Sequence, residues 1–112
     1  MTKSVLATMV SLFLCGVSIS QSYRQAIVAK DGTQCAAMFD DAVRVNIRPE
    51  MRRELAPIVA AIRHAENGGK GREYGILHPR VKPTYRSQAG WCAATVQKNY
   101  DRWTKAGKRG AF

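Results

Sequence analysis

One carboxylate stands where an acid can act in catalysis. Glu66 lies four residues after Ile62, so it continues the apolar stripe of the preceding segment and falls at the expected C-terminal end of a helix. An apolar wall and the negative end of the helix dipole both favour the neutral acid over the carboxylate. Such an acid is what general-acid cleavage of a glycosidic bond requires. The alternative is a solvated glutamate that pairs with Arg63 or Lys70.

A second carboxylate follows on the next loop. Glu73 lies seven residues after Glu66, close enough for the loop to fold back beside it. Hydrolysis of a glycosidic bond uses a second carboxylate to position water or to stabilise the positive charge that develops on the sugar. Glu73 is the candidate for that role. The alternative is an ion pair with Arg72 or Arg80 that holds the loop.

Helical spacing of apolar residues predicts the elements that position these carboxylates. Helices are expected from about 33 to 45, from Pro49 to the end at Asn67-Gly68, and from about 84 to 105. Pro57 is expected to kink or divide the second helix. Residues 23–30 fit a helix or a strand. The predicted fold is therefore a small, mainly α domain.

The first residues have the layout of a secretory signal peptide. A positive start at Lys3 precedes an apolar run over 5–19, and small residues stand before a cleavage point at Gln21. The run has about 15 residues, short of the ~20 that span a bilayer. We expect a signal peptide over 1–20, a domain over 21–112, and a secreted or periplasmic location. The alternatives are an uncleaved membrane anchor or tether through 5–19, or a buried N-terminal helix.

Two cysteines remain after such a cleavage. Cys35 and Cys92 each lie on the apolar stripe of an expected helix, so the two can face each other. An even number of cysteines in an oxidising compartment favours a disulfide between them. The alternative is a pair of buried free thiols.

Length and charge limit the classes of function. A chain of 112 residues excludes a large multi-domain enzyme and a dinucleotide-binding fold. The net charge of +10 suits a polyanionic partner, such as nucleic acid, lipid headgroups or bacterial cell-wall polymer. The histidines and cysteines do not have metal-ligand spacing, and the glycines at 68–71 lack the ending of a phosphate loop. We therefore expect no metal and no cofactor. We also expect a monomer.

The segment 61–103 resembles the lysozyme-like fold of bacterial and phage cell-wall enzymes, the lytic transglycosylases and their relatives. Ala65-Glu66-Asn67-Gly68 matches the helix end at which that family carries its catalytic glutamate. Tyr74-Gly75-Ile76-Leu77-His78 matches its glycine-containing turn, with His78 where a glutamine is usual. Residues 93–103 resemble its closing helix. The resemblance covers 43 of the 112 residues.

The resemblance implies roles for particular residues. Glu66 would be the acid and base, alone in a lytic transglycosylase and with Glu73 in a hydrolase. The substrate-binding candidates, by sugar stacking, hydrogen bonding or close approach, are Tyr74, Gly75, His78, Tyr85 and Trp91. Besides His78 in place of the glutamine, two further departures from the family are a short loop after the glutamate and a chain that stops at Phe112, where relatives continue into a further helix.

The leading hypothesis is a secreted or periplasmic enzyme that cleaves the glycan strands of peptidoglycan, with Glu66 as its acid. The first alternative is a non-catalytic or degenerate protein that binds the cell wall. The second is a small basic protein that binds nucleic acid through the cluster Arg44, Arg48, Arg52 and Arg53. The signal peptide disfavours that last interpretation, so no nucleic-acid partner is expected.

Overall fold

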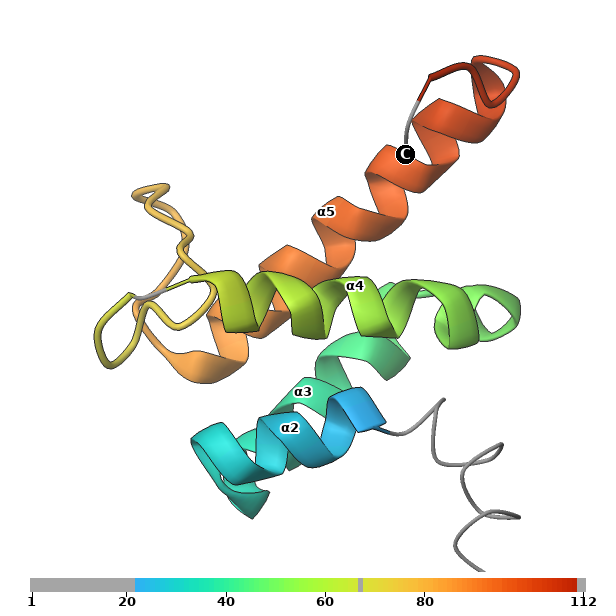
Figure 1. Ribbon diagram of the computed structural model, residues 1–112. Helices are drawn as coiled ribbons and strands as arrows, with labels where there is room; N and C mark the ends of the chain where they lie inside the picture. The colour runs from blue at the N-terminus through green and yellow to red at the C-terminus, as the bar shows by residue number, and fades with distance from the viewer. Residues whose placement is uncertain (1–21, 67, 111–112) are drawn as a thin grey trace, which may run out of the picture.

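The computed structural model describes residues 22–66 and 68–110, and within them the chain is helical without strands. The elements in order are α2 (Ser22–Asp31), α3 (Thr33–Asn46), the short 3-10 helix η1 (Pro49–Met51), α4 (Arg52–Ala65) and α5 (Tyr85–Lys105). A segment without regular structure joins α4 to α5 (Figure 1). The mainly α fold is confirmed. The signal peptide or anchor expected over 1–20 lies outside the described residues.

Helix boundaries follow the sequence signals closely. The helices expected over 33–45 and 84–105 are confirmed to within one residue. The ambiguous stretch 23–30 is helical, and a single residue, Gly32, separates it from α3. Gly32 has a φ of 90°, a left-handed conformation that favours a residue without Cβ. The chain therefore reverses there, and α2 packs against α3.

The expected division of the second helix at Pro57 is wrong. α4 continues through Pro57 to Ala65, and η1 precedes it as a separate short turn. Proline cannot donate to the carbonyl of the residue four positions earlier, which is Arg53. Arg53 is exposed, so water can reach the helix surface where that hydrogen bond is missing.

The core forms where α5 packs against α3 and α4 (Figure 1). Ala36 on α3 and Ala89 and Ala93 on α5 are fully buried, and such small side chains let helix backbones approach closely. Larger buried side chains come from each described α-helix and from the loop after α4: Ile27, Phe39, Leu55, Val59, Tyr74 and Val96. The interior is therefore a single apolar cluster shared by all these elements.

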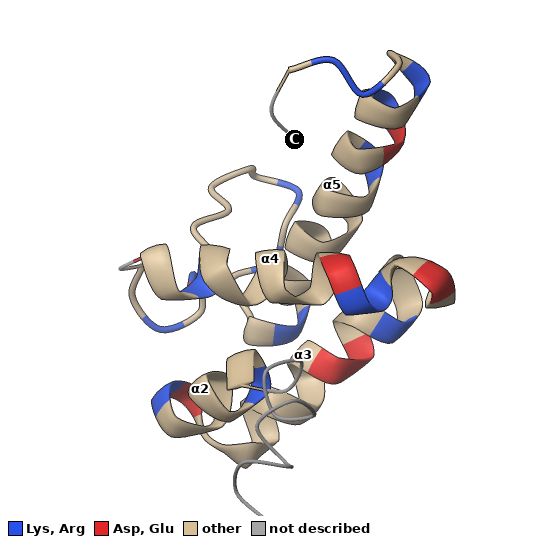
Figure 2. Cartoon of the chain, turned by 45° about the vertical axis from the view of Figure 1, so that its right-hand side comes forward, with Lys and Arg blue, Asp and Glu red and all other residues tan. Residues whose placement is uncertain are grey.

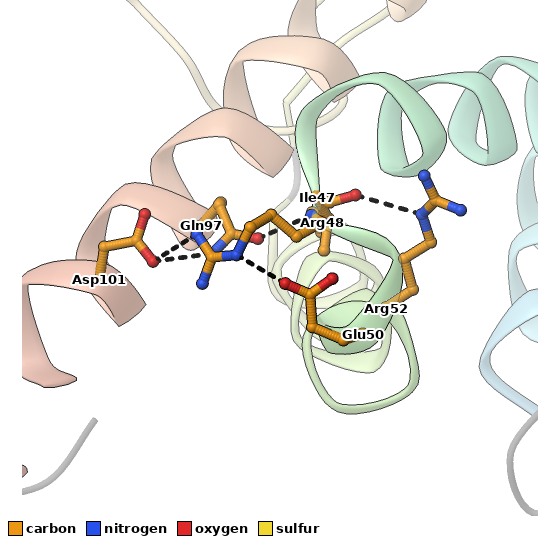
Figure 3. A network of polar contacts seen from close by, with 6 residues as sticks. All are labelled: Ile47, Arg48, Glu50, Arg52, Gln97 and Asp101. Carbon is orange, nitrogen blue, oxygen red and sulfur yellow. Dashed lines mark hydrogen bonds and ion pairs between the residues drawn. The ribbon is translucent and has the colours of Figure 1, made fainter.

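A polar network joins η1 to the middle of α5 (Figure 3). The backbone amide of Arg48 donates to Oε1 of the buried Gln97 at 3.0 Å, and Gln97 Nε2 donates to Asp101 at 3.0 Å. The Arg48 guanidinium completes the network with ion pairs to Asp101 at 2.8 Å and to Glu50 at 3.1 Å. This network anchors the chain where it enters α4.

The loop between α4 and α5 is attached to α5 by one side-chain amide. Gln88, which is fully buried, accepts from the backbone N–H of Ile76 and donates to its carbonyl, both at 2.9 Å. The same loop passes close to its own end, because a Cβ added at Gly71 would overlap the carbonyl oxygen of Pro83. Gly71 also has a φ of 90°.

Substituting Gly71 with alanine is expected to destabilise the protein by about 1–3 kcal/mol, because the added methyl group meets the Pro83 carbonyl and the backbone is left-handed. Gly69→Ala is the matched control, since nothing lies within 4 Å of a Cβ added there. Urea unfolding of both variants measures the difference. Equal stability of the two variants would contradict this account of the loop.

Candidate functional site

Glu66 ends α4 and lies against the glycine turn of the loop. Its backbone is extended, with a φ of −87° and a ψ of 136°, and its amide still donates to Ile62 at 3.1 Å. A Cβ added at Gly75 would overlap the carboxyl group of Glu66, so the carboxyl group packs directly on the backbone there. Glu66 is partly exposed. The structure thus brings together Glu66 and Gly75, the two motifs that the sequence singled out.

A buried arginine holds both ends of this loop. Arg63 is only 7% exposed, and its Nη1 donates to the backbone carbonyls of Glu66 and Glu73, each at 3.3 Å. Its other nitrogens form a two-pronged ion pair with Asp31 of α2, at 2.7 Å and 2.6 Å. Arg63 therefore binds the main chain at Glu66 and leaves the Glu66 carboxyl group to the loop turn.

Tyr74 and Tyr85, two of the candidates for stacking on sugar rings, are both buried in the structure, and Tyr85 has the core position that its place on the helix stripe also allowed. Tyr74 is 1% exposed and Tyr85 is 7% exposed, and their rings pack edge to face with centroids 5.2 Å apart. The Tyr85 hydroxyl donates to Asp31 at 2.8 Å, so the Tyr74 hydroxyl must be the donor to Tyr85 at 2.9 Å. Burial raises the pKa of both tyrosines, which keeps both hydroxyl protons in place.

Asp31 is ionised in this network. Burial by itself raises the pKa of Asp31, but the hydrogen bonds from Arg63 and Tyr85 and the positive charge of Arg63 outweigh it and hold the pKa below its usual value. Sequence reasoning treated Asp31 only as part of a helix break. A signal was present at Arg63, because it follows Leu55 and Val59 at helical spacing on a face that is otherwise apolar.

The side chain of Glu73 is partly buried, whereas a solvated loop residue would be exposed. Its Oε1 is inaccessible to solvent and has no hydrogen-bond partner in the described part of the chain. Neither Arg72 nor Arg80 forms an ion pair with it there. Its backbone carbonyl is held by Arg63. The main chain of Glu73 is thus held by the buried Arg63, whereas the carboxyl group of Glu66 packs on the glycine turn.

His78 and Trp91 form an exposed aromatic pair. Their rings stack with centroids 5.8 Å apart and an angle of 21° between the planes. Trp91 is 46% exposed, and it lines an open hollow of about 220 Å³ together with Ala94, Thr95 and Lys98. Of the predicted substrate-binding side chains, these two are the ones that the structure leaves accessible to a ligand.

The predicted disulfide does not form, because Cys35 and Cys92 are both free thiols. Burial raises the pKa of Cys35, and the nearby carboxylates of Asp31 and Glu73 add to the effect. Burial and the charge of Glu66 raise the pKa of Cys92 to about 12. The two thiols therefore have different charged neighbours. A shared apolar face does not set how two helices cross, and a disulfide needs Cα atoms within about 7 Å.

The basic cluster expected at the start of the second helix is largely engaged within the chain. Arg44 pairs with Asp41 at 3.4 Å, and Arg48 pairs with Asp101. Arg52 donates to the backbone carbonyl of Ile47 at 3.1 Å (Figure 3) and to that of Arg44 at 2.9 Å, both at the end of α3. These side chains consequently fix the α3–η1 connection, and Arg53 is the member left without a hydrogen bond or ion pair among the described residues.

Other features bear on the kind of site. Within 22–66 and 68–110, no group of three or more His, Cys, Asp or Glu side chains is placed to hold a metal ion. Over the same residues, no helix has the length and apolarity to cross a membrane. Comparisons with models of known families, with curated proteins and with solved structures find no match.

Asp31→Asn is expected to lower the free energy of unfolding by about 3 kcal/mol, because it leaves the charge of Arg63 buried without its counter-ion. The pKa of Asp31 is lowered by folding, so its contribution is present above about pH 4 and is lost as pH falls below the folded pKa. The difference in the free energy of unfolding between the wild type and the variant should therefore become smaller as the pH falls below about 4.

The matched control is Asp40→Asn, because Asp40 pairs with Arg24 at 2.8 Å but both side chains are more than 40% exposed. An exposed pair of this kind contributes less than about 1 kcal/mol. Urea unfolding at several pH values measures both variants. A similar loss in the two variants would contradict a special role for the buried pair.

The state of the thiols is open to direct measurement. Alkylation of the unfolded chain without reductant should label the peptides that contain Cys35 and Cys92 completely. In the folded chain Cys92 should stay unlabelled, because it is 3% exposed and its pKa is raised to about 12. Peptide mass spectrometry reads both results. A linked Cys35–Cys92 peptide would show the free-thiol assignment to be wrong.

Proposed function

We propose that this protein is a secreted or periplasmic enzyme of lysozyme-like fold that cleaves the glycan strands of peptidoglycan, with Glu66 as its general acid and base. The observation that carries the proposal is the placement of Glu66. Its partly exposed carboxyl group rests on the backbone at Gly75, and Arg63 holds the main chain on both sides of the loop. A carboxyl group positioned in this way can approach a polymer that lies along the loop.

In the proposed reaction Glu66 gives its proton to the glycosidic oxygen as the bond from that oxygen to C1 breaks. The carboxylate so formed then takes a proton from the hydroxyl group that attacks C1. In a lytic transglycosylase this is the 6-hydroxyl of the same sugar, and a ring-closed anhydro product forms. The placement of Glu73 favours this route with one carboxylate, because one oxygen of Glu73 is shut off from solvent.

The stacked pair of His78 and Trp91 supplies the sugar-binding surface in this proposal. The apolar C–H face of a pyranose ring packs on an exposed aromatic ring, and Trp91 presents such a face beside an open hollow. His78 comes three residues after Gly75 along the same loop. The net charge of +10 favours association with an anionic wall polymer.

Glu66→Gln should lower the rate of product release from purified peptidoglycan by about 10²–10⁴-fold, because the amide cannot give up a proton. Glu54→Gln is the matched control: it removes an exposed carboxylate from the same helix. Mass spectrometry of the soluble products measures both rates. Circular dichroism establishes that each variant is folded.

The products distinguish the remaining possibilities. Fragments with anhydro ends would support a lytic transglycosylase in which Glu66 acts alone. Fragments with reducing ends would show hydrolysis and make Glu73 the candidate second carboxylate. Undiminished release by the folded Glu66→Gln variant would overturn the assignment of the acid. Binding to wall sacculi without any release would favour the alternative, a non-catalytic protein that binds the wall.

A further inference from the structure

The C-terminal end of α5 extends beyond the rest of the molecule (Figure 1). The last buried residue of this helix is Gln97, and Tyr100 in the next turn still packs on the core with its partly buried ring. Lys and Arg residues, blue in Figure 2, recur along this end of the chain. We call them the basic tip, and its members are Arg102, Lys105, Lys108 and Arg109.

The chain beyond α5 is folded back into a defined cap. Gly107 has a φ of 79°, its N–H donates to Thr104 at 3.1 Å, and the N–H of Lys108 donates to Trp103 at 2.9 Å. This pair of hydrogen bonds is the Schellman motif that ends many helices. Trp103 Nε1 then donates to the carbonyl of Gly110 at 3.1 Å. The cap therefore brings Lys108 back beside Trp103, at the helix end that also carries Arg102 and Lys105.

The basic tip is not neutralised by the protein itself. Arginines elsewhere form ion pairs, such as Arg24 with Asp40 and Arg86 with Asp41. Asp101 is the acidic residue of the last two turns of α5, and it pairs with Arg48 on the opposite side. Within the described residues, no carboxylate pairs with any cation of the basic tip.

Aromatic side chains accompany these charges. The rings of Tyr100 and Trp103 lie 5.7 Å apart, and the Lys108 ammonium group lies 5.9 Å from the centre of the Trp103 ring. Trp103 is partly exposed. Tryptophan and tyrosine with neighbouring lysine and arginine form the composition that favours a membrane–water interface, where an apolar ring and a polar edge are both satisfied.

From these observations we propose that the basic tip docks the protein onto a bilayer that carries anionic lipid headgroups. A projecting helix end that carries several cations can approach a flat, extended surface such as a bilayer. The long stems of lysine and arginine let each charged group reach a phosphate. This docking is independent of the reaction proposed for Glu66.

The test compares sedimentation of the full chain with vesicles of phosphatidylcholine that contain phosphatidylglycerol and with vesicles of phosphatidylcholine alone. Lys105, Lys108 and Arg109 are replaced together by glutamine. Each cation at an anionic surface adds about fivefold in affinity, so the triple variant should bind the anionic vesicles about one hundredfold more weakly. Binding by the unaltered chain should also weaken as salt is added.

The matched control replaces Lys70, Arg80 and Lys82 by glutamine, which removes the same charge from exposed sites on the loop. It should keep most of its binding. The apolar stretch 5–19 is present in every variant, so the difference in binding between the tip variant and this control reports the replaced cations. Equal losses in the two triple variants, or equal binding to both vesicle types, would overturn the proposal. The proposal would also be overturned if the unaltered chain bound duplex DNA more tightly than the anionic vesicles and the tip variant lost that binding to DNA.

Discussion

The arrangement of this protein depends on one buried ion pair, between Arg63 of α4 and Asp31 of α2. Both side chains are less than 10% exposed, and two short hydrogen bonds join them. Removing two charges from water is costly, so such a pair persists only when every remaining donor and acceptor is used. Arg63 meets this condition by donating to two loop carbonyls, and Asp31 meets it by accepting from Tyr85.

The position of the candidate acid follows from this constraint. Since Arg63 binds the carbonyls of Glu66 and Glu73, the loop leaves α4 and returns to it at the same side chain. Gln88 fixes the next stretch of the loop to α5 through Ile76. The turn at Gly75 lies between these two attachments, and the carboxyl group of Glu66 rests on it. The buried network therefore sets the geometry of a partly exposed group.

The two halves of α5 have different surroundings. Its first half, up to Gln97, lies in the core and contributes Ala89, Ala93 and Val96. In its second half, Tyr100 still packs on the core, and the helix then ends in a folded cap. The four cations of the basic tip lie in the last turns of the helix and in this cap. The glutamine-centred network around Arg48 marks the change from one half to the other. In the two proposals made above, the loop that positions Glu66 is attached to the first half of α5 through Gln88, and the docking surface lies at the other end of the helix.

The sequence by itself determined the helices and the place of Glu66. Apolar spacing is a local signal, so the bounds of α3 and α5 were predictable to within a residue, whereas 23–30 stayed open between helix and strand and α4 begins three residues after Pro49. Only the tertiary structure decided which faces meet. Tyr85 binds Asp31 from 54 positions away, Tyr74 is buried, and Cys35 and Cys92 are free thiols. Periodicity reports which residues share a face of one helix, whereas these outcomes depend on how separate helices cross.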